Sequence, residues 1–275
     1  MRPGFPRGYR KPIRPQVDWG HRLSKGLTNC WLLGDGTGVA RNIGSLALDG
    51  VIGKVVNTDA NAPSHHGGNA LNFDNAGSPN TNVVTVTNWR IPAAGALTFA
   101  AWIYPRGDGG GNFGRVISKG DVINWFKGNV TAGMTFSVDS SSTTTISSSN
   151  KTPTNTWTHV AITYKSGGPA VWYFNGVVDS GAGSYTTAIP AENSQAAIGD
   201  RYNAAGDRGF DGYIEGVRTY DRVLPPEEVT LLYAEPYAGI YETAFPGYRN
   251  GVIVAASFLP RGLNIQQAVN RASTY

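Results

Sequence analysis

The sequence is poor in cysteine and in charged residues, and it has no long apolar run. Its only cysteine among 275 residues is Cys30, which excludes an intrachain disulfide and a cysteine-based metal site. Charged residues make up 15%, against about 25% in an average domain, while hydrophobic residues reach 40%; this combination excludes disorder of the whole chain. No apolar run approaches the roughly 18 residues that a membrane-spanning helix needs, and the N-terminal stretch has no apolar segment typical of a signal peptide. We expect a packed globular protein with no membrane partner.

Glycine, proline and aromatic residues are abundant instead. The chain holds 36 Gly and 16 Pro, which favour many turns, and seven Trp, 13 Tyr and ten Phe. Runs rich in β-branched and aromatic residues recur between turn clusters at intervals of roughly 8 to 15 residues, a pattern typical of a β-sandwich. The clearest runs are Val83–Thr87, Leu97–Tyr104, Met134–Val138, Trp157–Tyr164, Ala170–Val178, Ala196–Gly199 and Phe210–Tyr220.

The positive charge is concentrated at the N-terminus. The formal net charge is +4, but the first 25 residues hold seven basic residues and one acidic residue, so they carry +6 and the remainder carries −2. The globular part is therefore not expected to bind nucleic acid. Prolines at positions 3, 6, 12 and 15 favour an extended N-terminal arm, which is either a solvated leader or a docking strap for assembly. The arm residues assigned to assembly are Arg2, Arg7, Arg10, Lys11, Arg14 and Trp19.

One segment near the C-terminus predicts a helix. Leu224–Tyr233 begins with two prolines, carries Glu227 and Glu228 in its first turn, and spaces its apolar residues for one helix face. After it, residues 234–275 form an extension that contains the apolar run Gly251–Leu259. Such a run is expected to pair with a sheet edge or to contact a partner.

The runs, in their order along the chain, resemble the laminin-G-like or concanavalin A-like family. The motifs that carry the resemblance are LTNCWLLGDGTG (27–38), GNALNFD (68–74), LTFAAWIYP (97–105), RVISKGD (115–121), WTHVAITY (157–164), YFNGV (173–177) and FDGYIEGVRTYDRVLPPEEVTLLY (210–233). The resemblance implies an all-β, two-sheet antiparallel jelly-roll sandwich with one short helix. It divides the chain into a basic, Pro-rich arm (1–26), the jelly-roll domain (27–233) and a C-terminal extension (234–275).

The segments at the two edges of this domain are similar to the flanks of laminin-G-like domains in bacteriophage and prophage virion proteins. They are VDWGHRLSKGLTNCWLL (17–33) and LYAEPYAGIY (232–241). This similarity implies a non-enzymatic structural protein of the virion, such as a capsid decoration protein, assembled in the host cytoplasm. Its partners would be the major capsid protein or another virion protein, together with further copies of the chain.

The sequence offers little support for catalysis. Hydrolases of this superfamily need two carboxylates facing one sugar, and none of the six glutamates stands in a Glu-x-Asp-x-Glu arrangement. Cys30 lies inside an apolar strand, where a free cysteine is usually inert, and His159 lies on a sheet strand. We therefore predict no enzymatic activity, no catalytic residue, no metal site and no cofactor, although calcium could be held by loop oxygens such as those of Asp35 or Asp74.

The alternative function is that of a lectin-like module that binds carbohydrate. Glycan binding needs an exposed aromatic platform beside polar groups. Trp31, Trp102, Trp157 and Trp172 fall in strand motifs and are expected in the core, whereas Trp125 lies in a turn-rich stretch beside Asn124. The candidate glycan-binding residues are Trp125, Asn124, Asn203, Asp207 and Arg208.

Overall fold

The protein is described by a computed structural model that places most of the chain. The described residues are 11–12, 14–34, 38–53, 70–74, 82–89, 95–120, 123–127, 133–138, 145–179, 188–189, 194–203, 207–242, 248–249 and 252–253. Among them, no helix is long and apolar enough to cross a membrane.

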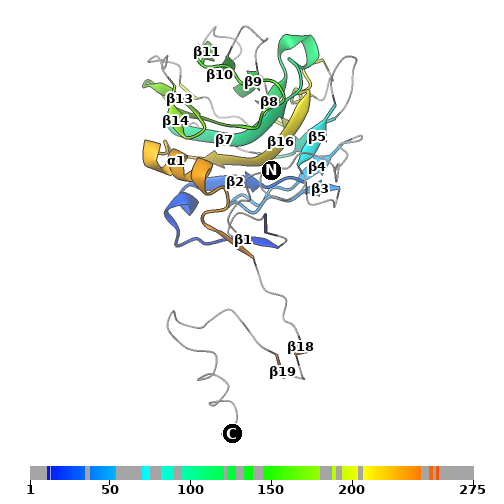
Figure 1. Ribbon diagram of the computed structural model, residues 1–275, viewed down its shortest axis with the longest axis vertical. Coiled ribbons are helices and arrows are strands. Elements are labelled where there is room, and N and C mark those ends of the chain that lie inside the picture. The colour runs from blue at the N-terminus through cyan, green and yellow to red at the C-terminus, as the bar shows by residue number, and fades with distance from the viewer. Residues whose placement is uncertain are drawn as a thin grey trace, which may run out of the picture.

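Two antiparallel sheets face each other in a sandwich (Figure 1). The eight-stranded sheet has the order β11-β10-β9-β8-β15-β6-β4-β3. Its strands are β3 (Val39–Ala40), β4 (Gly50–Ile52), β6 (Val84–Val86), β8 (Arg115–Lys119), β9 (Ile123–Lys127), β10 (Met134–Val138), β11 (Thr145–Ser147) and β15 (Ala196–Ile198). The seven-stranded sheet has the order β14-β13-β12-β7-β16-β2, with β5 also paired to β16. Its strands are β2 (Leu27–Trp31), β5 (Leu71–Phe73), β7 (Ala96–Pro105), β12 (Thr158–Lys165), β13 (Ala170–Phe174), β14 (Val177–Val178) and β16 (Gly212–Tyr220).

The main core fills the space between the two sheets. Because side chains alternate across a strand, every second residue of the long strands points inward. Phe99 of β7 lies at the centre of an aromatic cluster, with ring centroids 5.9 Å from Phe136, 6.1 Å from Trp89 and 6.3 Å from Trp125. All four side chains are buried. The predicted all-β jelly-roll fold with one short helix is confirmed.

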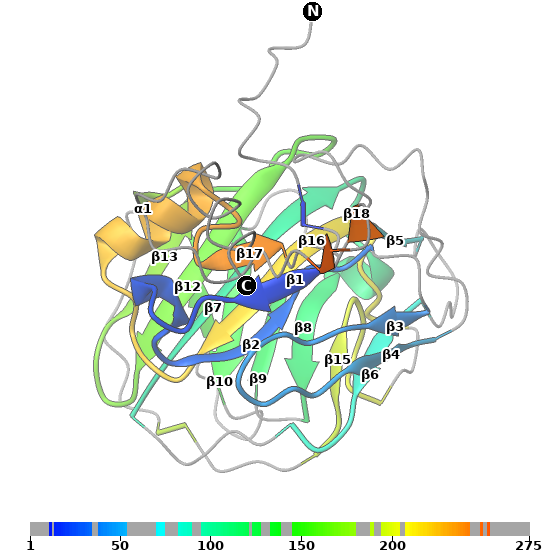
Figure 2. The same ribbon diagram turned by 90° about the horizontal axis from the view of Figure 1, so that it is seen from below.

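A second apolar cluster covers part of the outer face of the seven-stranded sheet. The helix α1 (Pro226–Ala234) lies here, and its buried residues Val229 and Leu232 pack on this face. Beside it, β1 (Pro15–Val17) pairs with β17 (Ile240–Glu242) (Figure 2). Parts of the segments that flank the predicted jelly-roll domain thus contribute to the folded body. A further short pair joins β18 (Tyr248–Arg249) and β19 (Val252–Ile253).

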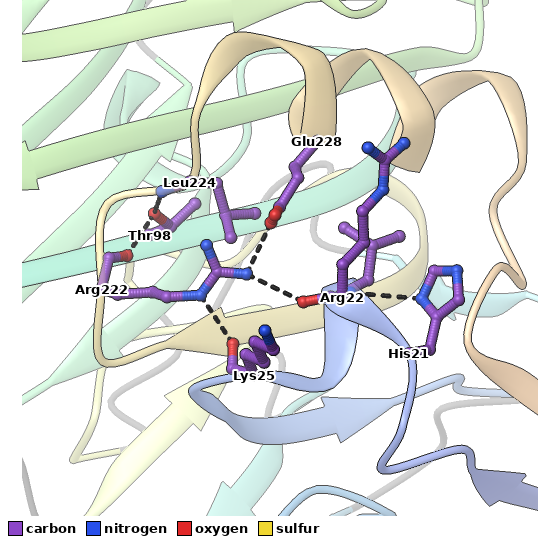
Figure 3. A network of polar contacts seen from close by, with 8 residues as sticks. His21, Arg22, Lys25, Thr98, Arg222, Leu224 and Glu228 are labelled. Atoms are coloured by element: carbon purple, nitrogen blue, oxygen red, sulfur yellow. Dashed lines mark hydrogen bonds and ion pairs between the residues drawn. The ribbon is translucent and has the colours of Figure 1, made fainter.

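Arg222 ties the N-terminal flank to α1 (Figure 3). Its Nε donates a hydrogen bond to the carbonyl of Lys25 at 2.7 Å, and its Nη2 donates to the carbonyl of Arg22 at 3.1 Å. The same Nη2 lies 2.5 Å from Oε2 of Glu228, in the first turn of the helix. Arg22 opens a 3-10 helix (Arg22–Ser24) whose N-cap is His21. One guanidinium therefore fixes this flank, the loop before α1 and the helix against one another.

Candidate functional site

Three aromatic side chains form a row across the outer face of the seven-stranded sheet. Tyr104 of β7 pairs in register with Tyr213 of β16, and Trp157 directly precedes β12, whose first residue pairs with Ile103. The ring centroid of Tyr104 lies 5.6 Å from that of Trp157 and 5.7 Å from that of Tyr213. All three side chains are half-buried. We call Tyr104, Trp157 and Tyr213 the aromatic row.

The neighbouring row of side chains on the same face of these strands is buried, in contrast to the aromatic row. Trp102 of β7 pairs with His159 of β12 and with Glu215 of β16, and all three side chains are buried. Tyr233, in the last turn of α1, lies over Trp102 and His159, with ring centroids 5.5 Å and 6.2 Å from theirs, and Tyr237 donates a hydrogen bond to Glu215. Each residue of the aromatic row lies two positions along the chain from a residue of this buried row, on the same face of the sheet.

Arg106 adds a charged group at the edge of the aromatic row. Its guanidinium carbon lies 5.2 Å from the centroid of the Tyr213 ring, within the range of a cation–π contact. Its Nε lies 3.1 Å from a carboxylate oxygen of Asp211, and its Nη2 donates to the carbonyl of Phe73 at 3.0 Å. These contacts hold Arg106 in one position, so the row ends in a fixed hydrogen-bond donor.

The predicted polar rim lies at the same end of the sandwich, in the segment before β16. Asn203 and Asp207 are exposed, and Arg208 is half-buried with its guanidinium carbon 4.5 Å from the centroid of the Phe113 ring. Arg208 Nη1 also donates to the carbonyl of Gly111 at 3.3 Å. Asn203, Asp207 and Arg208 are thus at least partly accessible to solvent, and their role in glycan binding stays a prediction.

Two other candidates lie in the interior, which corrects the sequence interpretation. Trp125 is fully buried in the main core, where its ring stacks against Phe99 at an interplanar angle of 16°. Asn124 is 8% exposed, and its Oδ1 accepts a hydrogen bond from Ser118 Oγ at 2.8 Å. Both residues belong to β9, which has strands on either side, so neither is a surface stacking residue. Conversely, Trp157 was expected in the core and is half-buried.

The assembly residues of the N-terminal arm are only partly described. Arg2, Arg7 and Arg10 lie outside the described residues. Lys11 is half-buried, Arg14 is exposed, and Trp19 is 54% exposed, close after β1. Their role in assembly stays a prediction.

Comparison with known sequence families identifies the domain. Residues 77–230, more than half of the chain, match the family described as the concanavalin A-like lectin/glucanases superfamily. The chain belongs to this superfamily. No curated protein matches the sequence at a significant level.

Solved structures agree with this concanavalin A-like fold. The binding domain of paraclostridial mosquitocidal protein 1 is similar with a TM-score of 0.57 and 15% sequence identity, over 77% of this chain and 52% of that one. The binding domain of botulinum neurotoxin DC is similar with a TM-score of 0.56 and 13% identity, again over 77% of this chain and 52% of that one. The chain thus spans about half the length of these structures. At such identities the likeness shows the fold.

The concanavalin A-like domain also contains a buried polar cluster under α1. Tyr237 donates a hydrogen bond to Oε1 of Glu215 at 2.9 Å, and Nη2 of Arg218 donates to the carbonyl of Pro236. Burial, reinforced by the Glu215 carboxylate, raises the pKa of Tyr237 well above its ordinary value. Burial also raises the pKa of Cys30. Glu215, Arg218 and Tyr237 line a cavity of about 10 Å³, which has room for about one water molecule. The two hydrogen bonds of the cluster hold residues 236–237 on the sheet.

The two calcium candidates differ in what the structure shows. Asp35 lies outside the described residues. Asp74 lies 3.8 Å from Nη2 of Arg106, a cation that opposes the approach of a divalent metal ion. The described part of the chain contains no group of three or more His, Cys, Asp or Glu side chains suited to hold a metal.

Proposed function

We propose that the chain is a carbohydrate-binding module that acts without turnover and that the aromatic row is its sugar-binding surface. The observation that carries the proposal is the half-buried cluster of Tyr104, Trp157 and Tyr213, held in register by three neighbouring strands. Grouped aromatic surface left open beside fixed polar groups is characteristic of a recognition site.

The physical chemistry of the row suits a sugar. One face of a pyranose presents C–H groups, which pack on an aromatic ring, while its hydroxyl groups need hydrogen-bond partners at the edge of the ring. Arg106, whose side chain is 30% exposed, provides a hydrogen-bond donor next to Tyr213 and is held in place by Asp211. Tyr104 and Tyr213 lie on sheet strands and Trp157 directly precedes one, so little conformational entropy is lost when a ligand binds.

The similarity to toxin binding domains is compatible with this proposal. The botulinum neurotoxin binding domain, about half of which matches this chain, was solved in complex with SialylT. The absence of enzymatic activity stays a prediction from the sequence.

The test compares a tryptophan inside the aromatic row with an exposed tryptophan outside it. Binding is first found on a glycan array and then measured by calorimetry for the wild type, Trp157→Ala and Trp19→Ala. Trp157→Ala is expected to weaken sugar binding about tenfold or more, the scale of one lost aromatic contact with its buried area. Trp19→Ala, which removes an exposed ring outside the row, is expected to leave it unchanged. Equal affinity in all three proteins would overturn the proposal.

Assembly on a virion, with a capsid or other virion protein as partner, remains the rival prediction from the sequence. The structure sharpens its test. Residues 15–25 contain β1 and the 3-10 helix that Arg222 holds, so deletion of 1–25 would disturb the fold itself. Deletion of residues 1–13 spares these contacts, and loss of particle co-sedimentation by that variant, with an unchanged melting temperature, is the outcome that favours assembly.

A further inference from the structure

Three arginine side chains gather at the end of the sandwich where β8 begins and β15 ends. Arg115 is the first residue of β8, Arg201 follows β15, and Arg208 precedes β16. Arg201 Nη1 lies 3.3 Å and Arg208 Nε 3.9 Å from the same Oδ2 atom of Asp207. One carboxylate oxygen is therefore shared by two guanidinium groups. The side chains of Arg201 and Arg208 are 30% and 28% exposed, so both are open to a ligand.

A glycine-rich loop sets the position of this arginine cluster, which consists of Arg115, Arg201 and Arg208. In the loop 107–114, a Cβ atom at Gly110 would lie 2.7 Å from the carbonyl oxygen of Asp207. A Cβ atom at Gly111, whose φ is +57°, would lie 2.6 Å from Nη1 of Arg208. The loop can lie flat against residues 207–209 because these positions have no side chain. Phe113 then lies under the Arg208 guanidinium and limits its freedom.

The positive charges of the cluster exceed the negative charges that act on it. Among the described residues, the charged groups that act most strongly on Arg115 are Arg201, Arg208, Asp207 and Asp200. Together with Arg115 itself, these groups make three cations beside two anions. Burial and the repulsion of Arg201 and Arg208 lower the pKa of Arg115 to about 10, against the weaker attraction of the two aspartates. An additional anion at this place would relieve the repulsion.

We propose that Arg115, Arg201 and Arg208 form a subsite that binds the carboxylate group of an acidic saccharide. The planar guanidinium group donates paired hydrogen bonds that match the two oxygens of a carboxylate. The proposal rests on the proposed function in that the ligand is a sugar, and it adds which chemical class of sugar is preferred.

The charge distribution of the chain favours one carboxylate over a densely charged polymer. Outside the first 25 residues the chain carries a net charge of −2, so the arginine cluster is a local positive site on a slightly acidic body. A nucleic acid or a highly sulfated polymer is bound by extended basic surfaces, because its affinity comes from many phosphate or sulfate contacts. A single acidic residue within a saccharide requires only a site of this size.

The experiment measures the affinity of the full chain for matched acidic and neutral ligands. The pairs are sialyllactose with lactose, and a galacturonic acid trisaccharide with its methyl ester. The wild type is expected to bind the acidic member of at least one pair about tenfold more tightly, the factor that a charge-assisted hydrogen bond provides. Sulfated lactose is included to separate a carboxylate site from a sulfate site.

Variants of the cluster give effects of opposite sign. Arg208→Gln and Arg201→Gln are each expected to reduce the ratio of acidic to neutral ligand affinity to about twofold or less. Asp207→Asn is expected to increase this ratio, because a competing carboxylate is removed. The control is Arg41→Gln, which removes an exposed arginine next to β3 and changes the net charge by the same amount. Melting temperatures check that each variant is folded, and two independent arginine variants keep the test valid if one is unstable.

The possible results separate this proposal from the proposed function. Loss of the preference with neutral binding retained supports the subsite and leaves the aromatic row intact. Acidic binding that survives Trp157→Ala but is lost in Arg208→Gln supports the subsite and contradicts the aromatic row. Four results would overturn the subsite. Two concern the wild type: equal binding of both members of every pair, and no binding of any acidic member at millimolar concentration. The others are a preference that Arg208→Gln and Arg201→Gln leave unchanged, and tighter binding of sulfated lactose than of sialyllactose.

Discussion

The indole ring of Trp102 lies against the ring of Tyr233, with centroids 5.5 Å apart and planes inclined by 27°. Tyr233 belongs to the last turn of α1, and Trp102 belongs to the same strand as Tyr104, two residues earlier. Successive side chains alternate across a strand, so Trp102 and Tyr104 share one face. This contact therefore marks where the cover of the seven-stranded sheet ends and the aromatic row begins.

Removal of the Tyr233 ring is expected to extend the open aromatic surface. Tyr233→Ala should expose Trp102, which is 4% exposed in the wild type, and should cost about 1 kcal/mol of unfolding free energy, the usual strength of an aromatic pair. Acrylamide quenching of tryptophan fluorescence measures the exposure. Unchanged quenching in a folded variant would contradict the assigned boundary.

The two tryptophans whose placement the sequence misassigned should respond differently to truncation. Trp125→Ala removes a fully buried indole and is expected to lower the unfolding free energy by about 3 to 5 kcal/mol, whereas Trp157→Ala should lower it by about 1 kcal/mol. Denaturation in urea measures both. Similar losses in the two variants would show that Trp157 lies in the core.

Arg222 is expected to control how firmly the N-terminal flank is held. Arg222→Ala removes the hydrogen bonds to the carbonyls of Lys25 and Arg22 and leaves Glu228 without this partner. We expect a loss of about 1 to 3 kcal/mol, because hydrogen bonds from a charged group are lost. Trypsin should cut after Lys25 faster than in the wild type. Arg222→Lys is the matched variant, and it should restore part of the resistance because it keeps the charge but loses the guanidinium fork.

The unfolding free energy is expected to fall as the pH rises above about 9. Burial raises the pKa of Cys30 from 9.0 and that of Tyr220 from 10.0 to about 12. The unfolded chain therefore loses these protons first, and each group lowers stability by about 1.4 kcal/mol per pH unit between its unfolded and folded pKa. Arg115 acts in the opposite direction above about pH 10, since its folded pKa is lowered to about 10 and the unfolded chain keeps this proton longer.

Urea denaturation from about pH 8 to about pH 11 measures this slope. Tyr220→Phe removes one of the responsible protons and should flatten the decline above about pH 10, where the unfolded tyrosine ionises. An equally steep decline in this variant would show that Tyr220 does not contribute.

Much of the fold could be predicted because its signals are local. Prolines before a helix, acidic residues in its first turn and apolar spacing placed α1 correctly. The candidate site depended on tertiary cover, which these signals do not contain. Turn-like neighbours suggested a surface loop at Trp125, but β9 pairs with β8 and β10 and directs this ring into the core. Trp157 has the same strand-like context as buried tryptophans, and the sequence does not show that the cover provided by Tyr233 reaches Trp102 and His159 but stops before Trp157.

The pairing of β1 with β17 determines how the domain responds to mechanical force. Pro15 pairs with Glu242 and Val17 with Ile240, so the chain enters and leaves the two-stranded ribbon at one end. Force that pulls residues 15 and 242 apart acts across the ribbon and opens its hydrogen bonds one after another, as a zipper opens, at low load. Beyond the ribbon, the hydrogen bonds of Tyr237 with Glu215 and of Arg218 with Pro236 resist on the C-terminal side, and the contacts of Arg222 resist on the N-terminal side. The ribbon thus extends first under tension and keeps the load from the sandwich that carries the aromatic row.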